Sequence, residues 1–203
     1  MIAIINYGLG NLGSIFNMLK KIGVRSVITS DIHEIADAEK LILPGVGHFD
    51  HAMQRINQGG LKDVLDVKAK EERVPILGIC LGMQIMTERS EEGQMPGLGW
   101  IQAKTVRFHL AKELNLKIPH MGWNTVTCSI PSPLTEGFEV EHRFYFVHSY
   151  HVVVAEEKHS ILKTEYGYSF DSGIQRENIF GVQFHPEKSH RFGMKLFDNF
   201  ATL

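Results

Sequence analysis

Cysteine is scarce in this sequence, with only Cys80 and Cys128 among 203 residues. A disulfide framework is therefore excluded, and each cysteine has to be judged as a free thiol. An excess of charge of one sign is also missing, because 21 Lys and Arg residues stand against 23 Asp and Glu residues, giving a formal net charge of -2. Such a surface has no general attraction for phosphate backbones or anionic membranes, so we expect neither nucleic acid nor a membrane as a partner.

Long hydrophobic runs, internal repeats and linkers are absent as well. The longest apolar region, around Val74–Met86, contains Gln84 and falls short of the ~20 residues that span a membrane. The N-terminal stretch has no basic leader and too short an apolar run for a signal peptide, so we expect a cytoplasmic protein. The length and the 43% hydrophobic content predict one domain over residues 1–203.

The N-terminal stretch NYGLGNLGSI raises a distant alternative, an NAD-binding oxidoreductase. Gly8, Gly10 and Gly13 match the pattern G-x-G-x-x-G, and Asp31 follows a second apolar run at about the spacing of a ribose-binding acid. A dehydrogenase would also need a substrate domain, for which 203 residues leave little room. A lone glycine pattern has many false matches, and we expect no cofactor.

Strand-like and helix-like segments alternate in the first half of the chain. Buried strands are predicted for Ile2–Asn6, Val24–Thr29, KLILPGVG and VPILGIC, with helical spacing between them and after Cys80. From Gly97 onward the character changes, and four β-branched and aromatic runs predict a largely antiparallel extension: WIQAKTVRF, WNTVTC, RFYFVHSYHVVV and NIFGVQFH. The last residues, RFGMKLFDNFATL, have helical spacing. The fold class that fits is α/β, with three α/β/α layers around a central mixed sheet.

The segment GICLG, residues 78–82, places a cysteine between two glycines where a buried strand passes into a helix. This is the thiol form of a nucleophile elbow, a turn so tight that the flanking residues must be small. The helix N-terminus favours the thiolate of Cys80, because unpaired N–H groups and the helix dipole lie beside it. A buried structural cysteine is the alternative.

A thiolate nucleophile needs a base, and the segment GVQFHPEKS supplies a candidate. His185 ends an apolar strand that Pro186 stops, so we expect the His185 and Glu187 side chains at the exposed carboxyl edge. Glu187 would accept from the second imidazole nitrogen and fix the tautomer, like the third member of a triad. A lone histidine among the 11 in the chain would be an ordinary surface or core residue, but the cysteine elbow favours catalysis.

A tetrahedral intermediate needs N–H donors for its oxyanion, each contributing ~3 kcal/mol to transition-state stabilisation. The PGVG loop, residues 44–47, follows a strand end and should lie beside Cys80 in a parallel sheet. Its backbone can approach a ligand closely, and the N–H of Leu81 is the expected second donor. The alternative for PGVG is a simple turn.

Five segments together, PGVG, GICLGMQ, PHMGWN, FVHSYH and GVQFHPEKS, resemble the triad-type (class I) glutamine amidotransferases, and specifically the glutaminase subunits of imidazole glycerol phosphate synthase. The resemblance covers nearly the whole chain, and PHMGWN is its most specific marker. It implies a flavodoxin-like fold and hydrolysis of glutamine to glutamate and ammonia. Cys80 would attack the amide, His185 would move protons and Glu187 would orient the imidazole.

The resemblance also implies a substrate site. Gln84 and Glu92 match positions that hold glutamine, with Glu92 meeting its α-ammonium group; a solvated helix face is the alternative for both. The other matching oxyanion and substrate positions are Gly45, Val46, Gly47, Leu81, His148, Ser149 and Tyr150.

For a partner, the resemblance implies a separate (β/α)8 barrel cyclase in a heterodimer. It would receive ammonia through an internal tunnel and make imidazole glycerol phosphate and an aminoimidazole carboxamide ribotide for histidine biosynthesis. We expect low glutaminase activity from the isolated chain, because the family's PGVG strand turns an N–H inward only when the partner carries its ligand. The matching interface positions are Asn11, His120, Trp123, Asn124 and Lys188, a buried aromatic being the alternative for Trp123.

Two positions depart from the family pattern, Asn6 where aspartate is usual and Gly13 where arginine is usual. The third glycine of the dinucleotide pattern is therefore coincidental. The departures leave open a paralogue that supplies ammonia to amidate a bacterial surface-glycan sugar precursor. A binding protein without turnover is a further alternative, which the presence of Cys80, His185 and Glu187 weakens.

The histidines lack convincing zinc spacing, so no metal is expected. Cys128 and the remaining histidines receive no role.

Overall fold

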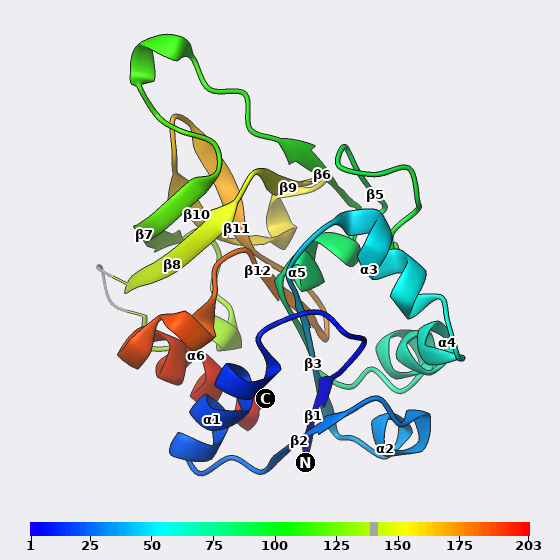
Figure 1. Cartoon of the computed structure of the whole chain (residues 1–203). Helices are drawn as coiled ribbons and strands as arrows, with labels where there is room; N and C mark the ends of the chain where they lie inside the picture. Colours follow the sequence, from blue (N-terminus) through cyan, green and yellow to red (C-terminus); the bar gives the residue numbers. More distant parts are fainter. Residues whose placement is uncertain (139–141) are drawn as a thin grey trace.

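The computed structural model describes residues 1–138 and 142–203 (Figure 1). Its first half comprises β1 (Ile2–Ile5), α1 (Leu12–Lys21), β2 (Ser26–Thr29), α2 (Ile32–Ala36), β3 (Lys40–Gly45), α3 (Phe49–Ile56), α4 (Leu61–Asp66), β4 (Ile76–Cys80) and α5 (Leu81–Ile85). Its second half comprises β5 (Arg89–Ser90), β6 (Ala103–Arg107), β7 (His120–Cys128), β8 (His142–His148), β9 (Tyr150–Val154), β10 (Ser160–Glu165), β11 (Ser169–Arg176), β12 (Ile179–Val182) and α6 (His190–Thr202).

The strands of the described residues form one 12-stranded sheet in the order β2-β1-β3-β4-β12-β11-β10-β7-β8, with β5, β6 and β9 paired off this path. β2, β1, β3, β4 and β12 run parallel, and the ladders from β12 through β8 are antiparallel. The predicted mixed sheet is therefore confirmed. The parallel strands bring their carboxyl ends to one edge, where β3 and β4 place the PGVG loop beside Cys80.

Each face of the parallel strands is covered by a different group of helices (Figure 1). Ile2 and Ile4 of β1 pack in a cluster with buried residues of α1 and α6, whereas Ala3 and Ile5 join a second cluster with residues of α2, α3 and α4. Because both faces are covered, these strands are apolar on both sides. The three-layer α/β/α architecture is confirmed.

Asp31 has a local structural role that was not predicted. It is the N-cap of the short helix α2, and its Oδ1 accepts hydrogen bonds from the N–H groups of His33 (2.7 Å) and Glu34 (3.4 Å). An N-cap carboxylate satisfies the orphan donors of the first helical turn. This contact explains the acidic residue after β2 without a nucleotide. Within the described ranges, no helix is both long and apolar enough to cross a membrane.

Gly13 supports the interpretation of the glycine pattern as coincidental. It lies within α1, and a Cβ at this position would have no heavy atom within 4 Å. We therefore expect Gly13→Ala to raise the free energy of unfolding by about 0.5–1 kcal/mol, because alanine loses less backbone entropy in a helix. Urea unfolding measures this change.

Gly10 is the matched control for Gly13. Its φ is +107°, and a Cβ there would lie 3.0 Å from Cβ of Pro44. Gly10→Ala should lower the stability, because the backbone angle is unfavourable for alanine and the turn is packed against β3. If Gly13→Ala instead lowered the stability, position 13 would require a residue without a side chain.

Candidate active site

The strand-to-helix turn predicted for residues 78–82 is present. β4 ends at Cys80 with φ +54° and ψ -111°, a conformation that non-glycine residues rarely adopt, and α5 begins at the next residue. A Cβ at Gly78 would lie 2.7 Å from the carbonyl oxygen of Gly82, and a Cβ at Gly82 would overlap the carbonyl oxygen of Leu43. Both positions therefore require glycine. Backbone strain of ~1–3 kcal/mol at Cys80 is typical of a functional position.

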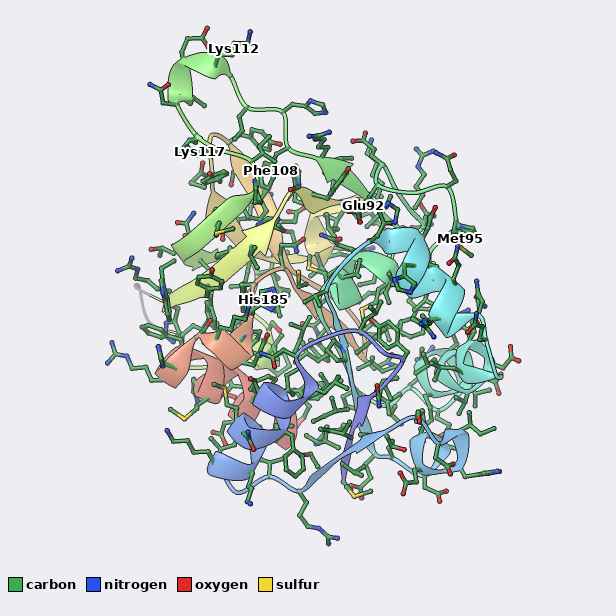
Figure 2. The ribbon with its side chains drawn as sticks, in the orientation of Figure 1. Glu92, Met95, Phe108, Lys112, Lys117 and His185 are labelled. Atoms are coloured by element: carbon green, nitrogen blue, oxygen red, sulfur yellow. The ribbon has the colours of Figure 1, made fainter. Side chains whose placement is uncertain are left out.

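His185 and Glu187 form a buried pair just beyond β12, and Figure 2 labels His185. Nδ1 of His185 lies 2.8 Å from Oε1 of Glu187. The expectation of an exposed edge is wrong, because His185 is only 1% exposed and Glu187 only 9%. Strand β8 covers them: the His185 N–H donates to the carbonyl of Tyr145 at 2.9 Å.

Opposing effects act on the imidazole of His185. Burial lowers its pKa, but hydrogen bonding and charge from Cys80 and Glu187 outweigh burial and raise the pKa above its ordinary value. Within the described residues, Nε2 of His185 and Oε2 of Glu187 are buried without a hydrogen-bond partner of good geometry. The raised pKa favours an imidazolium at His185, with Nε2 left to exchange a proton with a ligand.

A cavity of about 360 Å³ is lined by both Cys80 and His185, and its volume suits a small ligand. Its lining combines the nucleophile and base with most of the predicted substrate positions: Val46, Gly47, Cys80, Leu81, Gln84, Glu92, Pro119, Val147, His148, Ser149, Tyr150 and His185. The structure therefore brings together residues that are widely separated in the sequence.

The PGVG loop lies where the oxyanion site was predicted, with Gly45 paired to Cys80 across the parallel ladder. A Cβ at Gly45 would lie 2.9 Å from the backbone nitrogen of Gly82, so only glycine permits this approach. The buried hydroxyl of Tyr7 donates to the carbonyl of Pro44, a contact that the sequence did not predict. Burial is the main cause that raises the pKa of Tyr7, and the nearby Cys80 adds to it. The phenol therefore stays protonated and can donate.

Gln84 and Glu92 differ from the solvated helix face considered for them. Gln84 is buried in α5, and its Nε2 donates to the carbonyl of Tyr150 at 3.1 Å and to Oε1 of Gln183 at 3.0 Å. Glu92 lies in a turn after β5, because α5 ends at residue 85. Its Oε2 accepts from the N–H of Phe49 at 2.9 Å, where α3 begins. Figure 2 shows Glu92 beside this helix.

Of the predicted interface positions, Trp123 is 41% exposed and its ring stacks against His190, so the buried-aromatic alternative is wrong. His120 is instead buried, with its Nδ1 2.9 Å from Nε2 of His148. Asn11 is the N-cap residue of α1. Nδ2 of Asn124 donates a hydrogen bond to the carbonyl of Glu165. The Lys188 ammonium lies 5.5 Å from the centroid of the Tyr145 ring.

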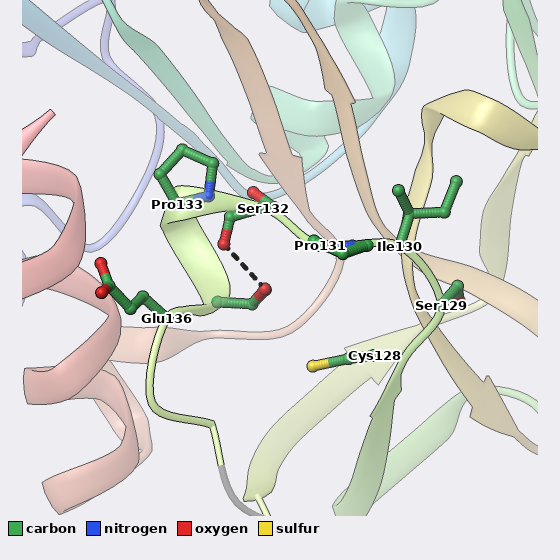
Figure 3. A pocket seen from close by; sticks show the side chains of 8 residues that line it. Cys128, Ser129, Ile130, Pro131, Ser132, Pro133 and Glu136 are labelled. Atoms are coloured by element: carbon green, nitrogen blue, oxygen red, sulfur yellow. Dashed lines mark hydrogen bonds between the residues drawn. The ribbon is translucent and has the colours of Figure 1, made fainter.

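A larger cavity of about 560 Å³ surrounds Cys128 at the end of β7 (Figure 3). Its lining includes Pro131, Pro133 and Glu136 but no histidine that could act as a base. The smaller cavity is therefore the candidate active site, because Cys80 and His185, the predicted nucleophile and base, both line it. Among the described residues, no group of three or more His, Cys, Asp or Glu side chains could hold a metal ion.

Comparisons with known proteins agree with this geometry. A family model described as glutamine amidotransferase class-I matches residues 3–202. The imidazole glycerol phosphate synthase subunit HisH 2 of Methanococcus maripaludis is 54% identical, covering 98% of each chain. HisH 2 of Pseudomonas aeruginosa is 48% identical and HisH of Bdellovibrio bacteriovorus 43% identical, each covering 100% of both chains.

Solved structures at lower identity share the fold. A glutamine amidotransferase matches with a TM-score of 0.73 at 16% identity, covering 100% of both chains. PurLQS from Thermotoga maritima matches with a TM-score of 0.70 at 19% identity, covering 99% of this chain and 97% of that chain. The chain therefore belongs to the class-I glutamine amidotransferases and, within them, to the imidazole glycerol phosphate synthase HisH subunits.

Proposed function

We propose that this chain hydrolyses the side-chain amide of L-glutamine to glutamate and ammonia, with Cys80, His185 and Glu187 as a catalytic triad. One observation carries the proposal: Cys80, at a strained strand-to-helix turn, and His185 line the same cavity, and the buried Glu187 pairs with His185 from behind it. Membership of the HisH subunits points to ammonia supply for imidazole glycerol phosphate synthase in histidine biosynthesis.

The reaction proceeds in two halves. The Cys80 thiolate attacks the amide carbon, and the oxyanion that forms is held by the N–H of Leu81 and an N–H of the PGVG loop. His185 gives its proton to the departing ammonia, which leaves a glutamyl thioester on Cys80. His185 then takes a proton from water as the water attacks the thioester, and glutamate leaves as the thiolate is restored.

The remaining lining residues hold glutamine in place. Glu92 brings a carboxylate to the cavity and would meet the α-ammonium group of the substrate. Both protons of the Gln84 amide nitrogen are directed to other protein oxygens, so its own oxygen remains for the ligand. His148, Ser149 and Tyr150 also line the cavity.

We infer that the ammonia passes to a separate barrel-shaped cyclase subunit. Exposed apolar side chains on and beside the site support a docking surface there, because Val46 is 42% exposed, Met121 61% and Trp123 41%. Exposed large side chains of this kind are typical of protein interfaces.

The decisive test is glutamate release by the purified chain, alone and with each candidate barrel subunit and its ligand. We expect slow hydrolysis by the chain alone and at least about tenfold faster release with the correct loaded partner, corresponding to about 1.4 kcal/mol of barrier. The stimulating partner identifies the acceptor: the histidine-pathway cyclase, as we propose, or a barrel acting on a surface-glycan sugar precursor. Rapid hydrolysis by the lone chain would contradict partner-dependent activation.

A further inference from the structure

We propose that Gln183 is a further catalytic residue of this site, donating a side-chain N–H hydrogen bond to the Cys80 thiolate while its carbonyl oxygen orients Gln84. The inference rests on the proposed role of Cys80 as the nucleophile. Gln183 directly follows β12 and is completely buried. Its Nε2 lies 3.7 Å from the Cys80 sulfur, and its Oε1 lies 3.0 Å from Nε2 of Gln84.

The direction of these bonds is fixed at the backbone carbonyl of Tyr150, which can only accept. Nε2 of Gln84 donates to this oxygen, so the same nitrogen must also face Gln183. Gln183 therefore turns its oxygen toward Gln84 and its nitrogen toward Cys80. Rotating the Gln183 amide by half a turn would set two N–H groups against each other and a carbonyl oxygen against the sulfur.

Two uncharged histidines form a hydrogen-bonded chain that ends at the Tyr150 carbonyl. Nδ1 of His148 lies 2.7 Å from this oxygen, and Nδ1 of His120 lies 2.9 Å from Nε2 of His148. Burial lowers the pKa of His120 to about 4 and the pKa of His148 well below its ordinary value. A neutral imidazole has one donor and one acceptor nitrogen, so each ring donates toward Tyr150. Asn124 closes the chain, with Nδ2 3.2 Å from Nε2 of His120.

An N–H group directed at sulfur stabilises the thiolate relative to the thiol. The other titratable groups that act on or are affected by Cys80 are His185 and Tyr7. At 3.7 Å the amide bond to sulfur is longer than a bond between nitrogen and oxygen, so its effect should be moderate. A Gln183 that only fills the core would leave the ionisation of Cys80 unchanged.

The test is the rate at which iodoacetamide alkylates Cys80 as a function of pH, in the full chain carrying Cys128→Ala to remove the second thiol. Gln183→Leu and Gln183→Met both remove the N–H donor without adding a charge, and Met keeps the length of the side chain. In both variants we expect the midpoint of the alkylation profile to rise by about one pH unit, so that alkylation at pH values below the midpoint slows about tenfold.

Gln175→Leu is the matched control. The Gln175 amide donates to the carbonyl of Glu177 at the exposed end of β11, and this variant should keep the original profile. If Gln183→Leu does not fold, Gln183→Met decides, because it keeps the length of the side chain and adds no charge. An unchanged midpoint in the folded Gln183 variants would overturn the inference, even if their stability fell. The proposed function is tested separately by glutamate release, so the two failures are distinguishable.

Discussion

Cys80→Ala is expected to abolish glutamine-dependent turnover by the chain with its partner, with a loss of at least roughly 10⁴-fold. No other group in the cavity provides the nucleophilic sulfur that forms the thioester. Synthesis from externally supplied ammonia should continue at its original rate, because the partner performs that step. The measurement is product formation by the complex with glutamine or with ammonium chloride as the nitrogen source.

Cys128→Ala is the matched control for this change. Cys128 is the second free cysteine, exposed at the end of β7 and outside the cavity that holds His185. The complex with Cys128→Ala should keep its original rate with glutamine and its original rate with ammonium chloride. An unchanged glutamine-dependent rate in Cys80→Ala would remove the proposed mechanism, and loss of both rates would indicate that the complex no longer assembles.

Glu187→Gln should lower kcat by roughly 10²- to 10⁴-fold with little change in KM, because it removes the charge that supports His185 without touching the substrate cavity. Nδ1 of His185 and Oε1 of Glu187 are 2.8 Å apart, and both side chains are buried. An amide at this position cannot stabilise the imidazolium as a carboxylate does, and it can impose the wrong tautomer. The pKa of His185 should fall, since Glu187 is one of the groups that raise it.

Steady-state kinetics of glutamate release measures the effect, and the pH dependence of Cys80 alkylation gives an independent readout. Glu136→Gln is a suitable control, because this substitution removes the same charge away from the triad. Glu136 lines the other cavity, beside Cys128. A Glu187→Gln enzyme with the original kcat would show that the carboxylate does not support His185.

Local sequence was sufficient where one short segment determines the geometry. The glycines on both sides of Cys80 predicted the tight turn, because a Cβ at Gly78 or Gly82 would collide with backbone. The spacing of His185 and Glu187, two residues apart, was sufficient to predict their hydrogen bond. Their burial was not predictable in this way, because β8 supplies the cover from a distant part of the chain.

The contacts of Gln183 could not be predicted from local patterns, because its partners Gln84 and Cys80 are 99 and 103 residues away in the sequence. One signal was present: a polar residue at the end of an otherwise apolar run, two positions before His185. Buried polar side chains must find hydrogen bonds, so such a residue marks a network.

The strands β10 and β11 were missed for a related reason. Their interior contains polar residues that pair with one another, and these pairs interrupt the apolar pattern. Ser160 donates to Asp171 at 2.6 Å, and Thr164 donates to Ser172 at 2.8 Å. Period-two alternation identifies strands with an apolar face, and it fails when the covered face is satisfied by hydrogen bonds instead.

The most direct measurement of the central claim is mass spectrometry of the complex after reaction with an electrophilic glutamine analogue. We predict one covalent adduct per chain, on the peptide containing Cys80, with excess glutamine slowing its formation and Cys128 left unmodified. Labelling that spares Cys80, or that glutamine does not slow, would contradict the assignment of this cysteine as the nucleophile.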